Sequence, residues 1–386
     1  MTLTEISPTR ANWLAVSSVA VGTFTIVTSE MSPVGLLTSI ARALGVSDGT
    51  AGLMVSAPGL VAAVSAPVLA ITARGLDRRF VLLGLTALLA VANLVAATAP
   101  TYPVMLAARV LTGVSIGGFW AFAAGLGVRL VPERSVGRAT SIILAGVSVA
   151  SVLGVPAVTF VSSFAGWRVS LAAVGVLALV LLAPLAATLP PLPGSAATRT
   201  PGAPRTWLSG PLRLVLVLTV LTIAGHFAAY TYVRPFLEQV SHAGPAFVGT
   251  ALLLYGAAGV AGNFAAGAWA ARRPRPVLIT LALLMTLSMA ALPMLGLPLP
   301  LLVVWGLGYG GVGVTLQLWI MRSGGGELGT ALFVGAFNVS IALGSFAGGR
   351  IVDGVSISAV MLVGAGLALV SAVVAGIWGR SRTTGS

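Results

Sequence analysis

Apolar runs long enough to cross a membrane follow one another along almost the whole chain. A helix needs about 20 mostly apolar residues to span the hydrocarbon core of a bilayer. A window of that length selects twelve runs, at residues 12–38, 49–72, 80–99, 102–128, 137–162, 168–190, 212–237, 246–271, 276–296, 300–321, 328–352 and 356–379. A transmembrane β-barrel would show short alternating segments instead. The sequence therefore predicts an all-α membrane protein with twelve transmembrane helices.

Composition excludes several classes of protein. Of the 386 residues, 57% are hydrophobic and 8% are charged, whereas soluble domains carry about 25% charged residues. The chain has no Cys, which excludes thiolate catalysis and cysteine-bound metal, and no Lys, which excludes a Walker-type ATP site. Eight acids and two His leave little for a metal site or for a membrane enzyme. We expect no enzyme activity, no metal and no cofactor.

The net charge of +13 comes from 21 arginines, and their distribution predicts the orientation of the chain. With the amino terminus inside the cell, Arg109 falls within a span and four arginines fall on the outer side: Arg42, Arg168, Arg234 and Arg350. The other sixteen then lie on the inner side, and the positive-inside rule predicts that both termini are cytoplasmic. Because these arginines are scattered over every inner loop, we expect no binding to nucleic acid.

A polar stretch divides the chain into two halves of six spans each. It is rich in Pro, Gly, Ala, Ser and Thr, as flexible linkers are. We predict a first half at residues 1–190, a cytoplasmic linker at 191–211 and a second half at 212–386. The basic loop Gly75–Leu82 after the second span is echoed by Arg272–Leu278 after the eighth. Two groups of six spans with similar basic loops at the same place are typical of transporters built from repeats, which bind a small molecule between their halves.

Six short motifs occur in order along the chain: Thr28–Leu37, Arg109–Gly113, Gly154–Pro156, Gly166–Arg168, Tyr230–Leu237 and Phe337–Gly344. Together with the spans, the linker and the basic second loop, they resemble the major facilitator superfamily over essentially the whole chain. The motifs are most similar to its drug/proton antiporter branch, which includes bacterial sugar-efflux (arabinose-efflux-like) and chloramphenicol-efflux permeases. The resemblance implies proton-driven efflux but no particular substrate.

Two groups of residues match motifs that the family uses in conformational change. The second loop holds Gly75, Asp77, Arg78 and Arg79, where the family pattern is Asp-Arg-x-Gly-Arg-Arg. The Asp is displaced here and an extra residue is present, so the resemblance leaves open whether Asp77 serves in the family's latch between halves. The fifth span carries Gly146, Gly154 and Pro156. Small residues at this spacing let helices approach closely, and Pro bends a helix.

Glu30 is the only acid well inside a predicted span, and Arg109 is the only arginine there. Charges at bilayer depth face a cavity or a partner and mark functional sites. We predict that Glu30 carries the coupled proton; the alternative is a hydrated Glu30 that only orients the end of the helix. The resemblance implies that Arg109 also takes part in proton coupling. The alternative is that Arg109 only holds two helices together. In either role, the guanidinium is expected to pair with an acid, with backbone carbonyls or with water.

Other polar and aromatic side chains inside the spans are candidates for the wall of a substrate cavity. An amide or hydroxyl in lipid needs a partner, so each is expected to face the interior of the bundle. At every position, the alternative to lining a cavity is that the side chain only makes a hydrogen bond to a neighbouring helix. The candidates are Thr25, Trp120, His226, Tyr230, Asn263, Gln317, Trp319 and Asn338.

The sequence thus predicts a proton-coupled antiporter that exports a small organic solute, such as a drug or a sugar, across the cytoplasmic membrane by alternating access. A role in antibiotic resistance would follow from drug efflux. The proton gradient replaces a cofactor, and a monomer suffices because the fold encloses its own pathway. The alternative is a facilitator or importer on the same fold, with Glu30 binding the substrate. A receptor or scaffold would call for a sizeable soluble domain, which the predicted spans leave no room for.

Overall fold

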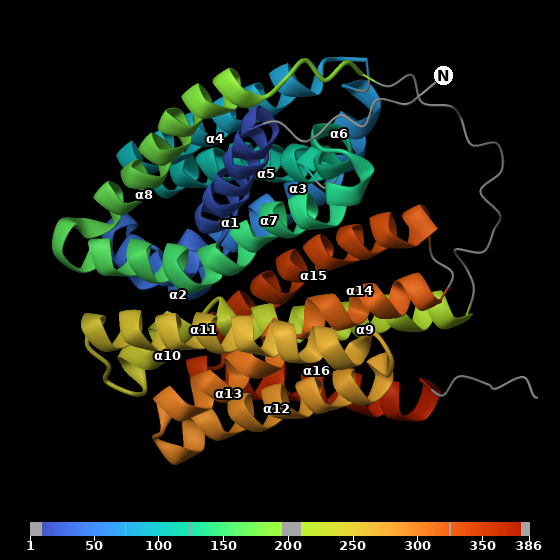
Figure 1. Cartoon of the computed structure of the whole chain (residues 1–386). Coiled ribbons are helices and arrows are strands. Elements are labelled where there is room, and N and C mark those ends of the chain that lie inside the picture. The colour runs from blue at the N-terminus through green and yellow to red at the C-terminus, as the bar shows by residue number, and fades with distance from the viewer. Residues whose placement is uncertain (1–9, 74, 124, 195–209, 324–325, 380–386) are drawn as a thin grey trace, which may run out of the picture. The chain divides into compact units, whose positions relative to one another are not determined.

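The computed structural model describes residues 10–73, 75–123, 125–194, 210–323 and 326–379, and all regular elements in these ranges are helical (Figure 1). The first group is α1 (Arg10–Leu44), α2 (Asp48–Ala51), α3 (Leu53–Thr72), α4 (Arg78–Thr98), α5 (Tyr102–Ala123), α6 (Leu126–Leu130), η1 (Glu133–Ser135), α7 (Val136–Val149), η2 (Ala150–Gly154) and α8 (Val155–Thr188). The second group is α9 (Gly210–Tyr230), α10 (Val233–Gln239), α11 (Pro245–Ala270), α12 (Pro274–Leu295), α13 (Pro298–Gly310), α14 (Val312–Arg322), α15 (Gly326–Gly354) and α16 (Ile357–Trp378). The predicted all-α fold is confirmed.

Eleven helical stretches of the described chain are long and apolar enough to cross a membrane. One of them, the 56-residue stretch Glu133–Thr188, contains the predicted span 137–162 and nearly all of the predicted span 168–190. The helix is interrupted inside that stretch at Gly166, whose φ of 84° is readily adopted only by glycine. The count of eleven therefore differs from twelve because two predicted spans join at this kink, and twelve crossings stay a prediction.

The described chain forms two compact units of contact. One contains residues 10–32 and 60–194, and the other contains residues 33–59 and 210–379. The boundary passes through α1 at Pro33 and through α3 after Gly59. Residues 195–209 of the predicted linker lie outside the described residues, and the predicted domain limits stay predictions.

In the first unit, α4 packs on both α5 and α8, and close approaches join α7 and η2 to α1. An added Cβ at Gly146 would meet the carbonyl oxygen of Ala20 and lie 2.9 Å from the amide nitrogen of Phe24. Gly154 makes a similar approach to Thr28. The prediction that small residues let these helices approach closely is confirmed.

A π-helical turn, η2, ends at Gly154, two residues before Pro156. Pro has no N–H group and cannot donate to the carbonyl four residues earlier, so a helix must adjust around it. A π-turn is one such adjustment and is frequent at functional sites. It lets α7 and α8 continue as one helical stretch from Val136 to the kink at Gly166.

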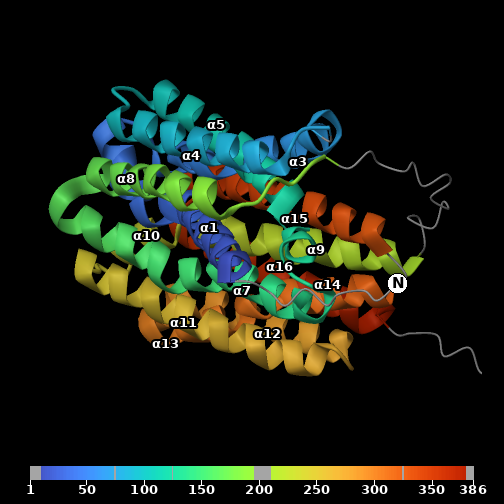
Figure 2. The ribbon, with the colours of Figure 1, turned by 45° about the horizontal axis from the view of Figure 1, so that its top comes forward.

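In the second unit, α9 lies beside α15 and α16, α11 packs on α13, and α12 packs on α13 and α16 (Figures 1 and 2). Glycines permit the closest of these contacts. Added Cβ atoms at Gly306 and Gly310 of α13 would strike the backbone of α11 at Tyr255 and Gly259. Small residues provide this close packing in membranes, where the apolar faces of helices gain little from leaving lipid.

We expect Gly146→Ala to lower the stability of the protein, because the added methyl group would push α7 away from the backbone of α1. Overpacking of this kind costs about 1–3 kcal/mol. The thermal unfolding midpoint in detergent measures it. Gly137→Ala is the matched control on the same helix, since its Cβ would have no neighbour within 4 Å. Equal midpoints for the two variants would contradict the packing account.

Candidate functional site

Arg109 of α5 binds the backbone of α1 next to Glu30. Its Nη1 donates to the carbonyl oxygen of Ser29 at 3.0 Å, and its Nη2 donates to the carbonyl oxygen of Glu30 at 3.1 Å. Pro33 explains the first bond, because residue 33 of a helix normally donates its N–H to the carbonyl of residue 29. The Ser32 hydroxyl donates to the same carbonyl at 2.9 Å. The carbonyl freed by Pro33 therefore has two side-chain donors.

The two charged side chains of this site differ in exposure. The guanidinium-bearing side chain of Arg109 is buried, with 2% of its surface exposed, while Glu30 is partly exposed. They are close enough to interact electrostatically. A buried Arg held by carbonyls is a fixed positive charge, and a partly exposed carboxyl beside it can exchange a proton with its surroundings. Of the partners predicted for Arg109, the backbone carbonyls are confirmed.

The polar stripe that precedes Glu30 on α1 is packed against other helices of the first unit. The Ser29 hydroxyl and the Asn93 amide of α4 bond to each other, with the amide nitrogen 2.8 Å from the hydroxyl oxygen. The Thr188 hydroxyl of α8 donates to Ser18 at 3.2 Å. Thr25 is fully buried and donates to the carbonyl of Val21 in its own helix. These contacts fix the rotation of α1 about its axis.

Five aromatic side chains of the second unit gather around His226, which is fully buried, and make a group of six rings with it. The six come from α9, α11 and α13, and they are His226, Phe227, Tyr230, Tyr255, Trp305 and Tyr309. Below, these six are called the aromatic cluster. His226 and Tyr230 were predicted from the sequence, and the structure brings them into a stack with ring centroids 4.9 Å apart. The other members add rings from helices that are distant in sequence.

Hydrogen bonds define the role of His226. The indole nitrogen of Trp305 donates to His226 Nδ1 at 3.2 Å, and the Tyr255 hydroxyl lies 3.5 Å from His226 Nε2. An indole N–H can only donate, so Nδ1 must accept and the imidazole proton is on Nε2. The ring is therefore a neutral, bonded member of the cluster, which favours a structural or binding role over proton transfer.

The remaining predicted cavity residues do not join this cluster through any described contact. Trp120 packs edge-on against Phe119 of α5, and Trp319 of α14 lies beside Gly379, which follows α16. The Asn338 amide donates to Val334 in its own helix at 2.9 Å. Asn263 and Gln317 are partly exposed on α11 and α14. Their place in a substrate cavity stays a prediction.

The second-loop motif ties the beginning of α4 to the chain that follows α8. Asp77 caps α4, accepting from the amides of Arg79 at 2.8 Å and Leu192 at 2.9 Å. Arg79 donates to the carbonyl of Ala186 at 2.6 Å, and the guanidinium of Arg78 lies over the ring of Phe122. Gly75 is exposed in the loop with open space around it. All these contacts lie within the first unit.

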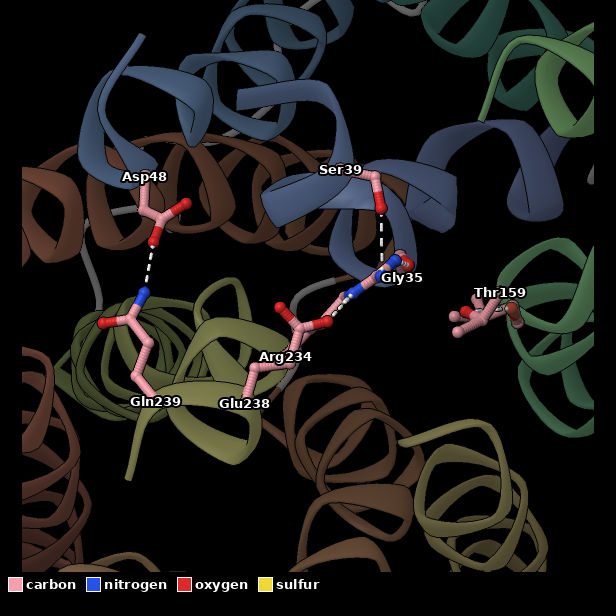
Figure 3. A network of polar contacts seen from close by, with 8 residues as sticks. Gly35, Ser39, Asp48, Thr159, Arg234, Glu238 and Gln239 are labelled. Carbon is pink, nitrogen blue, oxygen red and sulfur yellow. Dashed lines mark hydrogen bonds and ion pairs between the residues drawn. The ribbon is translucent and has the colours of Figure 1, made fainter. Parts of the chain in front are cut away.

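Residues 33–59 are bound to α10 by polar contacts within the second unit (Figure 3). The buried guanidinium of Arg234 donates to the carbonyl of Gly35, to the Ser39 hydroxyl at 2.9 Å and to Glu238 at 2.7 Å. The Gln239 amide donates to Asp48 at 2.7 Å (Figure 3).

Asp353, near the end of α15, holds the beginning of α2. Its carboxylate accepts from the amide of Gly49 at 3.0 Å and from the Ser47 hydroxyl at 2.7 Å. A carboxylate at a helix N-terminus is favourable because the first N–H groups there lack partners. Tyr232 adds a bond to the carbonyl of Ser345 at 2.8 Å beside the same segment. The end of α1 and the beginning of the next helix are thereby fastened to α10 and α15.

Comparison with known proteins identifies the family. The model of the Major Facilitator Superfamily matches residues 19–334. This chain belongs to that superfamily. The "Transcription regulatory protein OpdE" of Pseudomonas aeruginosa is 35% identical over 391 residues, covering 99% of this chain and 97% of that protein. The "Purine ribonucleoside efflux pump NepI" of Escherichia coli is 29% identical over 371 residues, covering 95% and 94%.

A solved structure of the nucleoside transporter NupG has the same fold, with a TM-score of 0.77 at 14% identity and coverage of 96% of this chain and 100% of that chain. The family consists of transporters and not of enzymes. The major facilitator chain described here is therefore a multi-pass membrane protein that transports a small molecule through a lipid bilayer.

Four of the six members of the aromatic cluster were not predicted from the sequence, namely Phe227, Tyr255, Trp305 and Tyr309. Trp305 and Tyr309 are four residues apart, as are His226 and Tyr230, so each pair lies on one face of its helix. That spacing was the available signal. The contact between α11 and α13 that assembles the cluster is not visible in local sequence.

We expect Arg109→Gln to cost about 2 kcal/mol of stability in the parent chain, because hydrogen bonds from a charged donor to the Ser29 and Glu30 carbonyls are lost. The cost should be smaller in a Pro33→Ala background, where the new amide N–H can bond to the Ser29 carbonyl. A double-mutant cycle on unfolding in detergent measures this coupling. Additive effects would show that Arg109 does not compensate for Pro33.

We expect Asp353→Ala to speed amide hydrogen exchange at Gly49 by roughly tenfold, because the carboxylate acceptor of that amide is removed. Hydrogen exchange with mass spectrometry measures it. The amide of Arg79, capped by Asp77 in the other unit, is the internal reference and should not change. Equal exchange at Gly49 in both proteins would show that Asp353 does not hold this segment.

Proposed function

We propose that this chain exports a small organic solute across the cytoplasmic membrane in exchange for entering protons. It would do so as a monomer with twelve crossings, with both termini in the cytoplasm and with the domain limits predicted from the sequence. Alternating access moves the solute outward. The proton gradient is the driving force.

One observation carries this proposal: a carboxyl group in the middle of α1 is partly exposed beside a buried guanidinium. Glu30 can bind and release a proton where it is, while Arg109 is held by the Ser29 and Glu30 carbonyls. The other acids with described side chains lie at helix ends or in loops: Asp48, Asp77, Glu133, Glu238 and Asp353. A single proton carrier is the simplest coupling device that these residues support.

The position of Glu30 relative to Pro33 supports a link between protonation and conformation. Glu30 lies three residues before Pro33, where α1 passes from one unit of contact to the other. A proline removes a backbone bond and makes a helix easier to bend there. Loss of the Glu30 charge on protonation changes the electrostatic force on Arg109, which holds the carbonyls at the same place. Proton binding would thus act at the hinge of α1.

The relatives support efflux of an organic solute rather than of an ion. The name of NepI describes a purine ribonucleoside efflux pump, and the structure of NupG is described as a nucleoside transporter. Drugs and sugars were the classes expected from the sequence, and nucleosides join them as candidates. The alternative, a facilitator or importer on the same fold, would move the same solutes without expelling them against a gradient.

We expect Glu30→Gln to abolish solute accumulation driven by a pH gradient in proteoliposomes, because a glutamine amide cannot carry the proton. Counterflow of the same solute should remain, because the binding site is intact. Inosine, arabinose and chloramphenicol are the radiolabelled probes, each assayed with and without the gradient. Glu133→Gln, at an exposed acid outside the spans, is the matched control and should behave as the parent does.

Two outcomes would contradict the proposal. Accumulation by Glu30→Gln at the parent rate would exclude Glu30 as the proton carrier. Counterflow by the parent chain with no accumulation of any probe under a pH gradient would favour the facilitator.

A further inference from the structure

We propose that the aromatic cluster binds the flat ring of the transported solute, and that the substrate is a planar heterocycle with hydrogen-bond acceptors. This inference rests on the proposed transport function and names the chemistry that the second half recognises. It assigns stacking to Tyr309, Tyr230 and Tyr255, and hydrogen bonding to the hydroxyls of Tyr230 and Tyr255.

Composition sets the aromatic cluster apart from ordinary packing. The chain has five tyrosines and two histidines, and three of those tyrosines and one of those histidines meet here. Apolar side chains would fill the same space in a membrane protein without hydroxyl or ring nitrogen atoms that need partners. Concentration of the scarce polar aromatics in one place is expected for a binding site.

The rings of the aromatic cluster form parallel faces with perpendicular walls. His226 and Tyr309 stack with centroids 3.4 Å apart and planes 6° apart, and Tyr230 stacks on Tyr255 at 4.7 Å and 25°. Trp305 meets Tyr230 at 86°, and Phe227 meets Tyr309 at 88°. Rings that stack on one another in this way offer the same kind of contact to the flat face of a solute ring.

Access to the aromatic cluster is best at Tyr309. His226 and Trp305 are fully buried, but Tyr309 is partly exposed. Its ring stacks on His226. Of the stacked rings, Tyr309 is therefore the one that a solute can reach without displacing a buried side chain.

Two helices are interrupted beside the aromatic cluster. α9 ends at Tyr230 and α10 begins at Val233, while α13 ends at Gly310 and α14 begins at Val312. Discontinuous membrane helices are typical of transporter binding sites, because irregular backbone is tolerated there and can rearrange. Tyr230 and Tyr309 lie at these interruptions, so the stack can open without disturbing a continuous helix.

Hydrogen bonding narrows the class of solute. Because His226 carries its proton on Nε2, that nitrogen donates toward the Tyr255 hydroxyl, whose own hydrogen can then be given to a solute. The Tyr230 hydroxyl has no hydrogen-bond partner among the described residues. Both hydroxyls can donate to ring nitrogens or carbonyl oxygens. A heterocycle of the purine kind has a flat face and such acceptors, which a hydrocarbon ring and a sugar do not combine.

The test is equilibrium binding to the purified full-length protein in detergent, without any pH gradient. The probes are radiolabelled inosine and caffeine as flat heterocycles and arabinose as a non-planar solute. We expect the parent chain to bind at least one flat probe and not arabinose. Tyr309→Leu should weaken binding of that probe by at least tenfold, because the stacking face is lost, and Tyr309→Phe should retain binding within about threefold because base–aromatic stacking needs only the ring.

Trp269→Leu is the matched control, since it removes an aromatic side chain from α11 that is 75% exposed and belongs to no ring contact given above. It should bind the flat probe as the parent does. Failure of both flat probes to bind the parent, preferential binding of arabinose, or equal binding by Tyr309→Leu would each overturn the inference. Binding without accumulation under a pH gradient would instead support the ring site and contradict proton exchange, so the two proposals fail separately.

Discussion

The bond between Arg109 and the carbonyl of Ser29 is the interaction on which the rest of the site depends. Pro33 frees that carbonyl in a membrane interior where water cannot satisfy it. Arg109 and the Ser32 hydroxyl both donate to it, and Arg109 is in turn held in place as a buried positive charge. Glu30 therefore has a fixed electrostatic neighbour, and α1 has a point at which it can bend without exposing an unsatisfied carbonyl.

The parts of α1 before and after Pro33 are each held by contacts with other helices. Before Pro33, Ser29 bonds to Asn93 within the first unit. After Pro33, Arg234 of the second unit holds Gly35 and Ser39, and Asp353 holds the start of α2. Glu30, the proposed proton carrier, thus lies in a segment of α1 that is fastened on either side to different groups of helices. A change in charge at Glu30 acts where these two sets of contacts meet, which is the requirement for coupling a proton to a conformational change.

The fold was predictable because membrane spans are set by length and hydrophobicity, and Glu30 and Arg109 were recognisable because charges are rare at that depth. The hydrogen-bond partner of Arg109 could not be predicted, since an acid, a backbone carbonyl or water could each accept from its guanidinium. Tyr255 and Tyr309 were missed because the glycine contacts between α11 and α13 join them only in three dimensions. Twelve spans were predicted but eleven helical stretches are long and apolar enough, because two predicted spans lie in one stretch that is kinked at Gly166.

Exchange of solute for proton can be followed in proteoliposomes of the parent chain that contain inosine and a pH-sensitive dye and are diluted into inosine-free buffer of the same pH. If solute and proton move in opposite directions, as we propose, the lumen becomes acidic as inosine leaves, because each outward step is exchanged for an inward proton. Exit of inosine with no change in the pH of the lumen would contradict it.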